Sequence, residues 1–287
     1  MARFDWYQAT VMAEVLDVRA CLADLAPMGK WEHMQRAPHG YAFGDRLVDC
    51  DGPACMVWWG GTHVHPHAVI SGELAQPGSE LLRAELPAHA VTRADVCIDY
   101  AEPGAYDRLQ QLALAVAKDR TIRVGTAGDH LLTFKGRTCY LGATSSHTRL
   151  RLYDKAAELR DKFAADPVRL SGVPEHLARF ECQVRPQTSV AKLAAASLDP
   201  LSLMGSAAWM RELMRLVSGI ELEPFEAGKV WRQSDDARAW AAVLAQYGGL
   251  FRRVFQDAGS WECVGLQIGA DLAERDLAKR RAKGGPA

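Results

Sequence analysis

Three short stretches of this sequence carry ionisable side chains at every second position. They are TRADVCIDY at 92–100, TRLRLYDK at 148–155 and LARFECQVRP at 177–186. Together they supply carboxylates, arginines and one tyrosine, which are the groups that phosphoryl transfer requires. Carboxylates bind a divalent metal ion, arginines hold a phosphate in a fork geometry, and a phenolate attacks phosphorus.

The alternation places the ionisable groups of each stretch on one face of a strand, because successive side chains of a strand point to opposite faces. For each strand alone, the simpler interpretation is an amphipathic sheet with a solvated face. If the three strands are neighbours, however, the carboxylates, the arginines and the phenol converge. Grouped carboxylates repel one another unless a cation binds between them, and hard oxygen ligands suit Mg²⁺ or Mn²⁺.

Tyr153 is the candidate nucleophile, because it lies between Arg151 and Lys155 where a strand gives way to a helical pattern. A phenol titrates near pH 10, and we expect the two cations to favour the phenolate. Tyr140 lies near the same turn and is an alternative nucleophile. Its apolar neighbours favour a packed tyrosine.

The elements that must position these residues can be read from the hydrophobic periodicity. The patterns predict strands at 4–12, 91–104, 121–126, 131–141, 148–153 and 176–186, a hairpin at 41–60, and helices at 15–27, 79–89, 106–120 and 154–166. After 187 the chain is rich in Ala and Leu with helical spacing, broken near 219–229 and 248–249.

We therefore predict an α+β fold with a central antiparallel sheet, in which 1–187 form one domain that carries the three stretches. Residues 188–287 form a mostly helical C-terminal region with a basic tail. Similar short stretches at 2–11 and 178–186, with a looser version at 92–100, are compatible with a duplicated β-α-β unit.

The bulk composition limits the classes of protein. The chain has 287 residues, is 48% hydrophobic and has a formal net charge of −1, as in a globular protein without a global basic signature. Residues 120–160, however, include eight Lys and Arg residues and only three Asp and Glu residues. Seven cysteines without a C-x-x-C pair, no signal-peptide pattern and no membrane-length apolar run indicate a cytoplasmic protein.

The three stretches, with CYLGATSSHTRLRLYDKAAEL around the second, resemble the replication initiation factor family. This family comprises rolling-circle initiators of plasmids and filamentous phages, with related relaxases. Its pattern is an Arg-x-Asp-x-x-x-Asp strand, a Gly-Ser/Thr-rich turn beginning here at Gly142, an Arg-x-Tyr-Asp-Lys block, and Arg-x-Glu on a later strand. The resemblance covers about residues 4–186.

The resemblance implies an endonuclease in which 1–187 are a nicking and strand-transfer domain. It nicks and joins one DNA strand through a 5′-phosphotyrosine and frees a 3′-OH. The DNA partner that the resemblance implies is an origin, single-stranded or cruciform, and the further partners are a host helicase and polymerase. No membrane is involved, and a homodimer is left open. Carried over residue by residue, the catalytic residue is Tyr153, the metal ligands for Mg²⁺ or Mn²⁺ are Asp95, Asp99 and Glu181, and the phosphate contacts are Arg93, Arg149, Arg151, Lys155 and Arg179.

Two alternatives stay open. His63 and His65 in GGTHVHPHAV match the His-hydrophobic-His metal motif of the HUH endonucleases, another group of tyrosine nickases. The chain could also bind DNA without cutting it, as a replication or regulatory protein in which Tyr153 packs or stacks. A metabolic enzyme has little support, because the sequence has no Gly-rich phosphate loop, no G-x-S-x-G and no zinc-ligand spacing.

Overall fold

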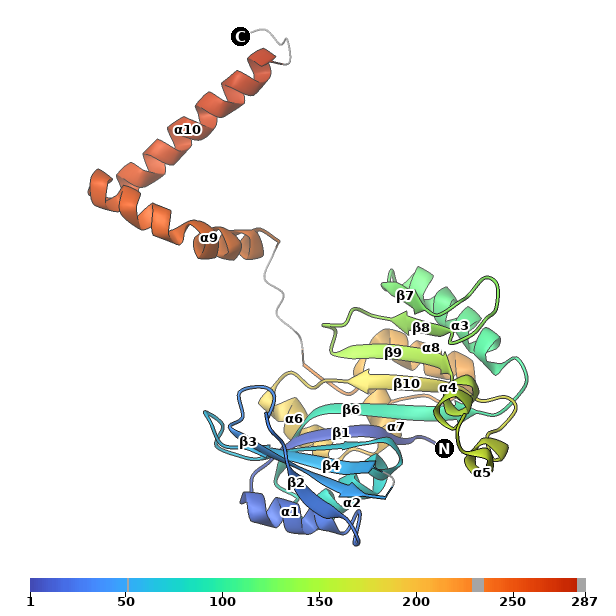
Figure 1. Cartoon of the computed structure of the whole chain (residues 1–287). Helices are drawn as coiled ribbons and strands as arrows, with labels where there is room; N and C mark the ends of the chain where they lie inside the picture. Colours follow the sequence, from blue (N-terminus) through green and yellow to red (C-terminus); the bar gives the residue numbers. More distant parts are fainter. Residues whose placement is uncertain (51, 229–234, 283–287) are drawn as a thin grey trace. The chain divides into compact units, whose positions relative to one another are not determined.

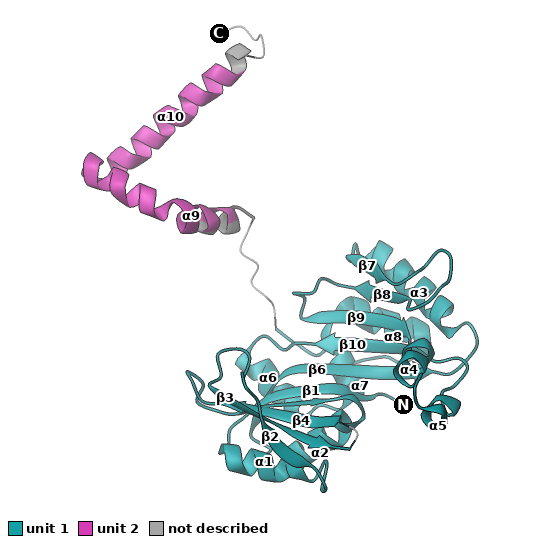
Figure 2. Cartoon of the chain, in the orientation of Figure 1, with its two compact units in different colours: residues 1–230 teal, residues 231–287 magenta. Residues whose placement is uncertain are grey.

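The computed structural model describes residues 1–50, 52–228 and 235–282. The chain divides into two compact units, residues 1–230 and 231–287 (Figure 2). The strands are β1 (Arg3–Val11), β2 (Lys30–His33), β3 (Phe43–Asp49), β4 (Gly52–Trp59), β5 (His67–Ser71), β6 (His89–Tyr100), β7 (Val124–Ala127), β8 (Thr138–Leu141), β9 (Thr148–Asp154) and β10 (Ala178–Val184). The helices are α1 (Val15–Ala23), α2 (Ala75–Glu85), α3 (Ala105–Asp119), α4 (Lys155–Lys162), α5 (Pro167–Ser171), α6 (Ser189–Ser197), α7 (Pro200–Leu203), α8 (Ala208–Ser218), α9 (Asp235–Ala258) and α10 (Trp261–Ala282), with short 3₁₀ turns at Gly72–Leu74 and Met204–Ser206.

The strands form one 10-stranded sheet in the order β2-β3-β4-β5-β1-β6-β10-β9-β8-β7 (Figure 1). Every neighbouring pair is antiparallel. The predicted α+β class with a central antiparallel sheet is therefore confirmed. The three strands with alternating ionisable groups are β6, β10 and β9, and they are direct neighbours.

One face of the sheet is covered by helices, and we call the opposite face the open face. Inward side chains of the strands, such as Phe4, Leu152 and Phe180, are 0–1% exposed and join one hydrophobic core with residues of α1, α2, α3, α6, α7 and α8. Burying a side chain of this size contributes about 1.5–3 kcal/mol. The alternating pattern thus fixes which face carries the ionisable groups, because a slip of one residue would bury them in this core.

The sheet consists of two halves with the same topology. In each half, one strand is followed by a helix and then by a strand at an outer edge, and three further strands return to the centre. The first half has the order β1-β5-β4-β3-β2 and the second β6-β10-β9-β8-β7, with β1 and β6 paired at the centre. The expected duplication is present, but its unit is larger than β-α-β. The similar stretches in β1 and β10 are not equivalent strands, because β1 corresponds to β6.

We predicted that the helical region begins after residue 187, whereas the second compact unit comprises residues 231–287. Helices α6, α7 and α8 pack on the sheet within the first unit, and the second unit contains α9 and α10. The predicted break at 248–249 is wrong, since α9 continues through it. Residues 283–287 of the basic tail lie outside the described residues. Within the described residues, no helix combines the length and apolarity that a bilayer span requires.

The predicted strand at 131–141 is only partly correct, because β8 begins at Thr138. The Asp129 carboxylate accepts hydrogen bonds from the backbone N–H groups of Leu131, Leu132 and Thr133 at 2.7–2.9 Å. These hydrogen bonds hold the chain in a loop, and they outweigh the strand preference of the apolar residues at 131–134.

Candidate active site

The strand register brings the predicted site residues onto the open face of β6, β10 and β9. Three rows cross these strands. They are Asp99–Arg179–Tyr153, Cys97–Glu181–Arg151 and Asp95–Gln183–Arg149. Directly paired residues of antiparallel strands have Cβ atoms about 4.5–5.5 Å apart, so neighbouring rows form one continuous polar surface.

Tyr153 ends the first row and is only 4% exposed. Its hydroxyl donates a hydrogen bond to Oε2 of Glu181 at 3.4 Å. Burial raises the pKa of Tyr153 well above its ordinary value of 10, and the charge of Glu181 raises it further. The phenol is therefore protonated in this structure and has a carboxylate within reach to take the proton.

Glu181 is 6% exposed and is suited to that task. Burial, followed by the negative charge of Asp95, raises the pKa of Glu181 from 4.5 to about 7. A carboxyl group with such a pKa is a stronger proton acceptor near neutral pH than an ordinary one. Raised carboxyl pKa values of this kind are frequent at functional sites.

Two of the predicted cations lie against the Tyr153 ring. The Arg151 guanidinium carbon is 4.1 Å from the ring centroid, and Lys155 Nζ is 5.7 Å from it. Arg151 also lies 3.8 Å from Oε1 of Glu181, and Lys155 pairs with Glu158 at 3.0 Å. The expectation that these two cations favour the phenolate is wrong for this structure, because burial and the charge of Glu181 raise the pKa of Tyr153, and the cation that opposes them is Arg179.

Arg179 is held by carboxylates. Its Nε and Nη2 donate to both oxygens of Asp99 at 2.7 and 2.9 Å, and its Nη1 donates to Asp5 at 2.6 Å. Asp99 also accepts from Arg3 at 2.6 Å. Burial would raise the pKa of Asp99, but the bonds from Arg179 and Arg3 outweigh it and hold that pKa below its ordinary value. A phosphate contact for Arg179 stays a prediction, and in this structure its guanidinium ties three strands together.

Asp5 belongs to this site, although the sequence analysis did not place it there. The register of β1 against β6 shifts between Phe4 and Trp6, so that Asp5 occupies a β-bulge. A bulge re-aims one side chain, and here both Asp5 and Trp6 lie on the polar side while Phe4 is buried. The only sequence signal was an acid in the otherwise alternating β1 stretch.

The predicted metal ligands share one face but have different partners. Asp95 is 3% exposed and is bound by Arg93 at 2.5 and 2.9 Å, and burial raises its pKa. Asp99 is taken by the two arginines described above. In the part of the chain that the structure describes, no group of three or more His, Cys, Asp or Glu side chains is arranged to hold a metal ion. The oxygen donors suit Mg²⁺ or Mn²⁺ chemically, and after burial the negative charge of Asp95 is the next cause of the raised pKa of Glu181. A metal site built from them stays a prediction.

Two arginines of β9 have unused hydrogen-bonding capacity. Nε of Arg149 and Nε of Arg151 are buried, and neither has a hydrogen-bond partner in the structure. Arg149 lies over the ring of Tyr140, with its guanidinium carbon 4.2 Å from the ring centroid. The rest of each side chain is open to solvent, since that of Arg151 is 41% exposed and Arg149 is half-buried, so the two guanidinium groups are suited to bind an anionic ligand such as a phosphate.

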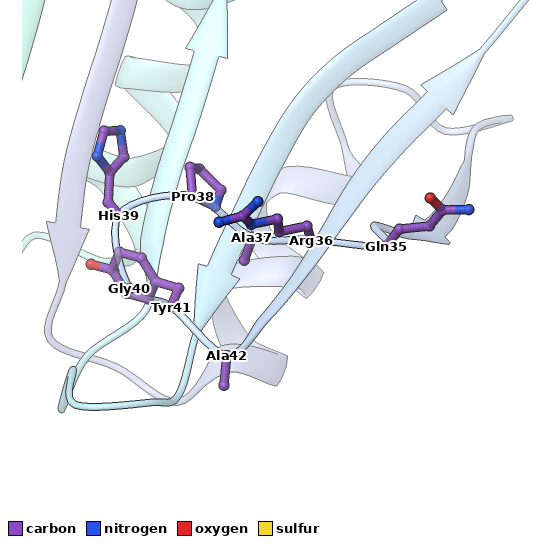
Figure 3. Close-up of a pocket in the computed structure, with 8 residues that line it drawn as sticks. All are labelled: Gln35, Arg36, Ala37, Pro38, His39, Gly40, Tyr41 and Ala42. Atoms are coloured by element: carbon purple, nitrogen blue, oxygen red, sulfur yellow. The ribbon is translucent and has the colours of Figure 1, made fainter.

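The histidines of the alternative metal motif lie in the first half of the sheet. His63 is exposed, its Nε2 lies 2.9 Å from the carbonyl oxygen of His39, and its ring stacks on Tyr41 at 3.9 Å. His39 and Tyr41 belong to the loop 35–42, which lines a pocket of about 590 Å³ (Figure 3). His63 and His65 are not part of a metal-binding group among the described residues.

The two halves of the sheet differ in the row that ends at Tyr153. The row Thr10–His67–Trp58 crosses β1, β5 and β4 as Asp99–Arg179–Tyr153 crosses β6, β10 and β9. Trp58 thus stands where the second half has Tyr153. Burial lowers the pKa of His67 to about 4, so the ring is neutral near pH 7.

Comparisons with known proteins support the fold. No protein-family model and no curated protein matches the chain. Among solved structures, the chain is similar to the rolling circle replication initiator protein from Geobacillus stearothermophilus, with 19% sequence identity and a TM-score of 0.50. The similarity covers 85% of this chain and 95% of that chain, and it shows a shared fold.

Proposed function

We propose that this chain initiates rolling-circle DNA replication by nicking and rejoining one DNA strand through Tyr153. The observation that carries the proposal is the hydrogen bond from the Tyr153 hydroxyl to Glu181, on a polar face that also presents Arg149 and Arg151. The fold shared with a rolling-circle initiator supports the assignment to replication initiation.

In the proposed reaction, the Tyr153 oxygen attacks the phosphorus of the scissile phosphodiester while Glu181 takes the phenolic proton. The bond from phosphorus to the 3′ oxygen breaks, and that oxygen leaves as a 3′-OH after gaining a proton from water. The 5′ phosphate stays on Tyr153 as a phosphodiester. Reversal of these steps by another 3′-OH joins the strand.

The cations would hold the phosphate and the negative charge that develops on it. Arg149 and Arg151 are the best placed, because both are partly open to solvent on the polar face and Arg151 has only a distant carboxylate contact, at 3.8 Å. Arg93, Lys155 and Arg179 are already paired with carboxylates and would contribute to the field around the phosphate. Dependence on Mg²⁺ or Mn²⁺ is part of the proposal. Asp95 and Asp99, with Asp5 beside them, would supply the oxygen ligands in place of their present arginine partners. Glu181, the third carboxylate of the predicted set, would stay free to take the proton.

Covalent capture tests the proposal. The protein is incubated with Mn²⁺ and single-stranded oligonucleotides from its own replicon, and a denaturant-resistant protein–DNA adduct is sought on a gel. Wild type and Tyr140→Phe are expected to form the adduct, and Tyr153→Phe is not. An adduct that survives in Tyr153→Phe and vanishes in Tyr140→Phe would move the nucleophile to β8.

The second candidate function is DNA binding without cleavage, and the burial of Tyr153 favours it. A phenol that is 4% exposed with a raised pKa can be a packed side chain of a regulatory protein. In that case the oligonucleotides would bind in a salt-sensitive manner, but no adduct would form with any metal ion.

A further inference from the structure

The loop between β7 and β8 presents an apolar tip to solvent. Leu131 and Leu132 are each 84% exposed, and Phe134 is 51% exposed. We call these three side chains the apolar tip. Large apolar groups gathered on an exposed loop usually mark an interaction site.

The loop that carries this tip is held in shape by its own hydrogen bonds. The Asp129 carboxylate accepts three backbone N–H groups and also the Thr133 hydroxyl at 2.8 Å. At the neck, Asp129 N–H donates to the Lys135 carbonyl at 3.0 Å. A Cβ on Gly128 would lie 2.2 Å from the Gly136 carbonyl oxygen, so only glycine permits this close approach. A loop organised in this way loses little conformational entropy when it binds.

The loop is also fixed to the body of the first unit. The Arg137 guanidinium carbon lies 5.2 Å from the Phe134 ring centroid and 4.3 Å from that of Tyr106. Arg137 pairs with Asp107 at 2.6 Å, at the beginning of α3. The tip therefore projects from an anchored base.

The position of the loop links it to the candidate active site. Thr138, the first residue of β8, is the register partner of Tyr153. The Asp154 N–H donates to the Arg137 carbonyl at 3.4 Å. The loop thus leaves the sheet at the strand end that holds Tyr153, where α4 begins (Figure 1). Lys135 is exposed next to the tip and provides a cation for a phosphate.

We propose that the apolar tip is a wedge that enters a base step where duplex DNA meets single-stranded DNA beside the nick. This rests on the proposed function. Apolar side chains inserted between base pairs unstack them. A small, rigid apolar tip is suited to such insertion, and the cation beside it can bind a backbone phosphate. Three side chains are too few for a stable protein interface, which buries roughly 800 Å² on each partner.

The test uses a DNA stem–loop with 2-aminopurine in the last base pair of the stem, whose emission rises when the base unstacks. Binding is measured separately by anisotropy of an end label at low salt. Wild type is expected to raise the emission about twofold or more. The Leu131→Ser/Leu132→Ser variant is expected to bind with similar affinity but to leave the emission unchanged. Val190→Ser, which alters a side chain 78% exposed on α6, is expected to behave like wild type.

Tyr153→Phe separates this proposal from the nicking reaction, since it is expected to give the full emission rise without forming an adduct. The wedge is overturned if wild type gives no rise, or if the double variant gives the same rise as wild type. Sedimentation is measured beside the emission, and a double variant that dissociates a dimer but still gives the wild-type emission rise would show that the tip contacts a second copy instead of DNA. Absence of any binding to the stem–loop would overturn the wedge together with the proposed function.

Discussion

Arg179 is expected to stabilise the sheet far more than its neighbour Arg151, although both are arginines of the same polar face. The guanidinium of Arg179 makes three hydrogen bonds to the carboxylates of Asp99 and Asp5, and its side chain is 7% exposed. The Arg151 side chain is 41% exposed and has one carboxylate contact, at 3.8 Å.

Replacing Arg179 by Gln leaves two largely buried carboxylates without their main partner, and breaking such a pair costs about 3–5 kcal/mol. Because Asp99 keeps its bond from Arg3, we expect the lower end, about 3 kcal/mol in the free energy of unfolding. For a unit of this size, that loss corresponds to a fall of about 6–12 °C in Tm. Arg151→Gln removes the same charge and is expected to cost about 0–1 kcal/mol.

Urea unfolding followed by near-ultraviolet circular dichroism measures both variants. A difference of less than about 1 kcal/mol between Arg179→Gln and Arg151→Gln would refute the reasoning, because exposed pairs already account for that much. It would mean that Asp5 and Asp99 find other partners or are solvated once Arg179 is gone.

Four further predictions concern the site itself. Nicking is expected to rise roughly tenfold between pH 6 and pH 8, because Glu181 with a pKa of about 7 accepts a proton only when ionised; a flat pH profile would exclude it as the acceptor. The pKa of Glu181 is about 7 in the folded protein and 4.5 ordinarily, so the protein loses stability as pH rises from 4.5 through 7. Glu181→Gln is therefore expected to raise the free energy of unfolding by up to about 3 kcal/mol at pH 8 and not at pH 4. The same variant is expected to abolish nicking. Arg149→Gln is expected to lower the slope of log affinity against log salt by about 1 in titrations with single-stranded DNA, and an unchanged slope would remove Arg149 from the phosphate contacts. Chelation with EDTA is expected to stop nicking, and Mn²⁺ to restore it; full activity in EDTA would contradict the metal requirement.

The polar face could be predicted from the sequence because it depends on a period of two. The alternation in 148–155 and 177–186 determines which side chains share a face, and the hydrophobic core enforces that choice. The alternation does not predict that these strands are neighbours, because that depends on the order in which strands pair across the whole sheet. Only the resemblance to a known family led us to expect it.

The environment of Tyr153 could not be predicted in the same way. Its pKa depends on how deeply the ring is buried and on the distance to Glu181, and both follow from packing across three strands. The two adjacent cations therefore led to the opposite expectation. Asp5 was missed because a β-bulge breaks the alternation at that residue, and the loop after Asp129 was missed because its hydrogen bonds are local.

The central claim is that Tyr153 forms the covalent bond to DNA. The most direct measurement is mass spectrometry of the trapped protein–oligonucleotide adduct after protease and nuclease digestion. We predict that the nucleotide remnant maps to Tyr153, on a peptide from the β9–α4 segment. A remnant on Tyr140 or on any other residue would contradict the account.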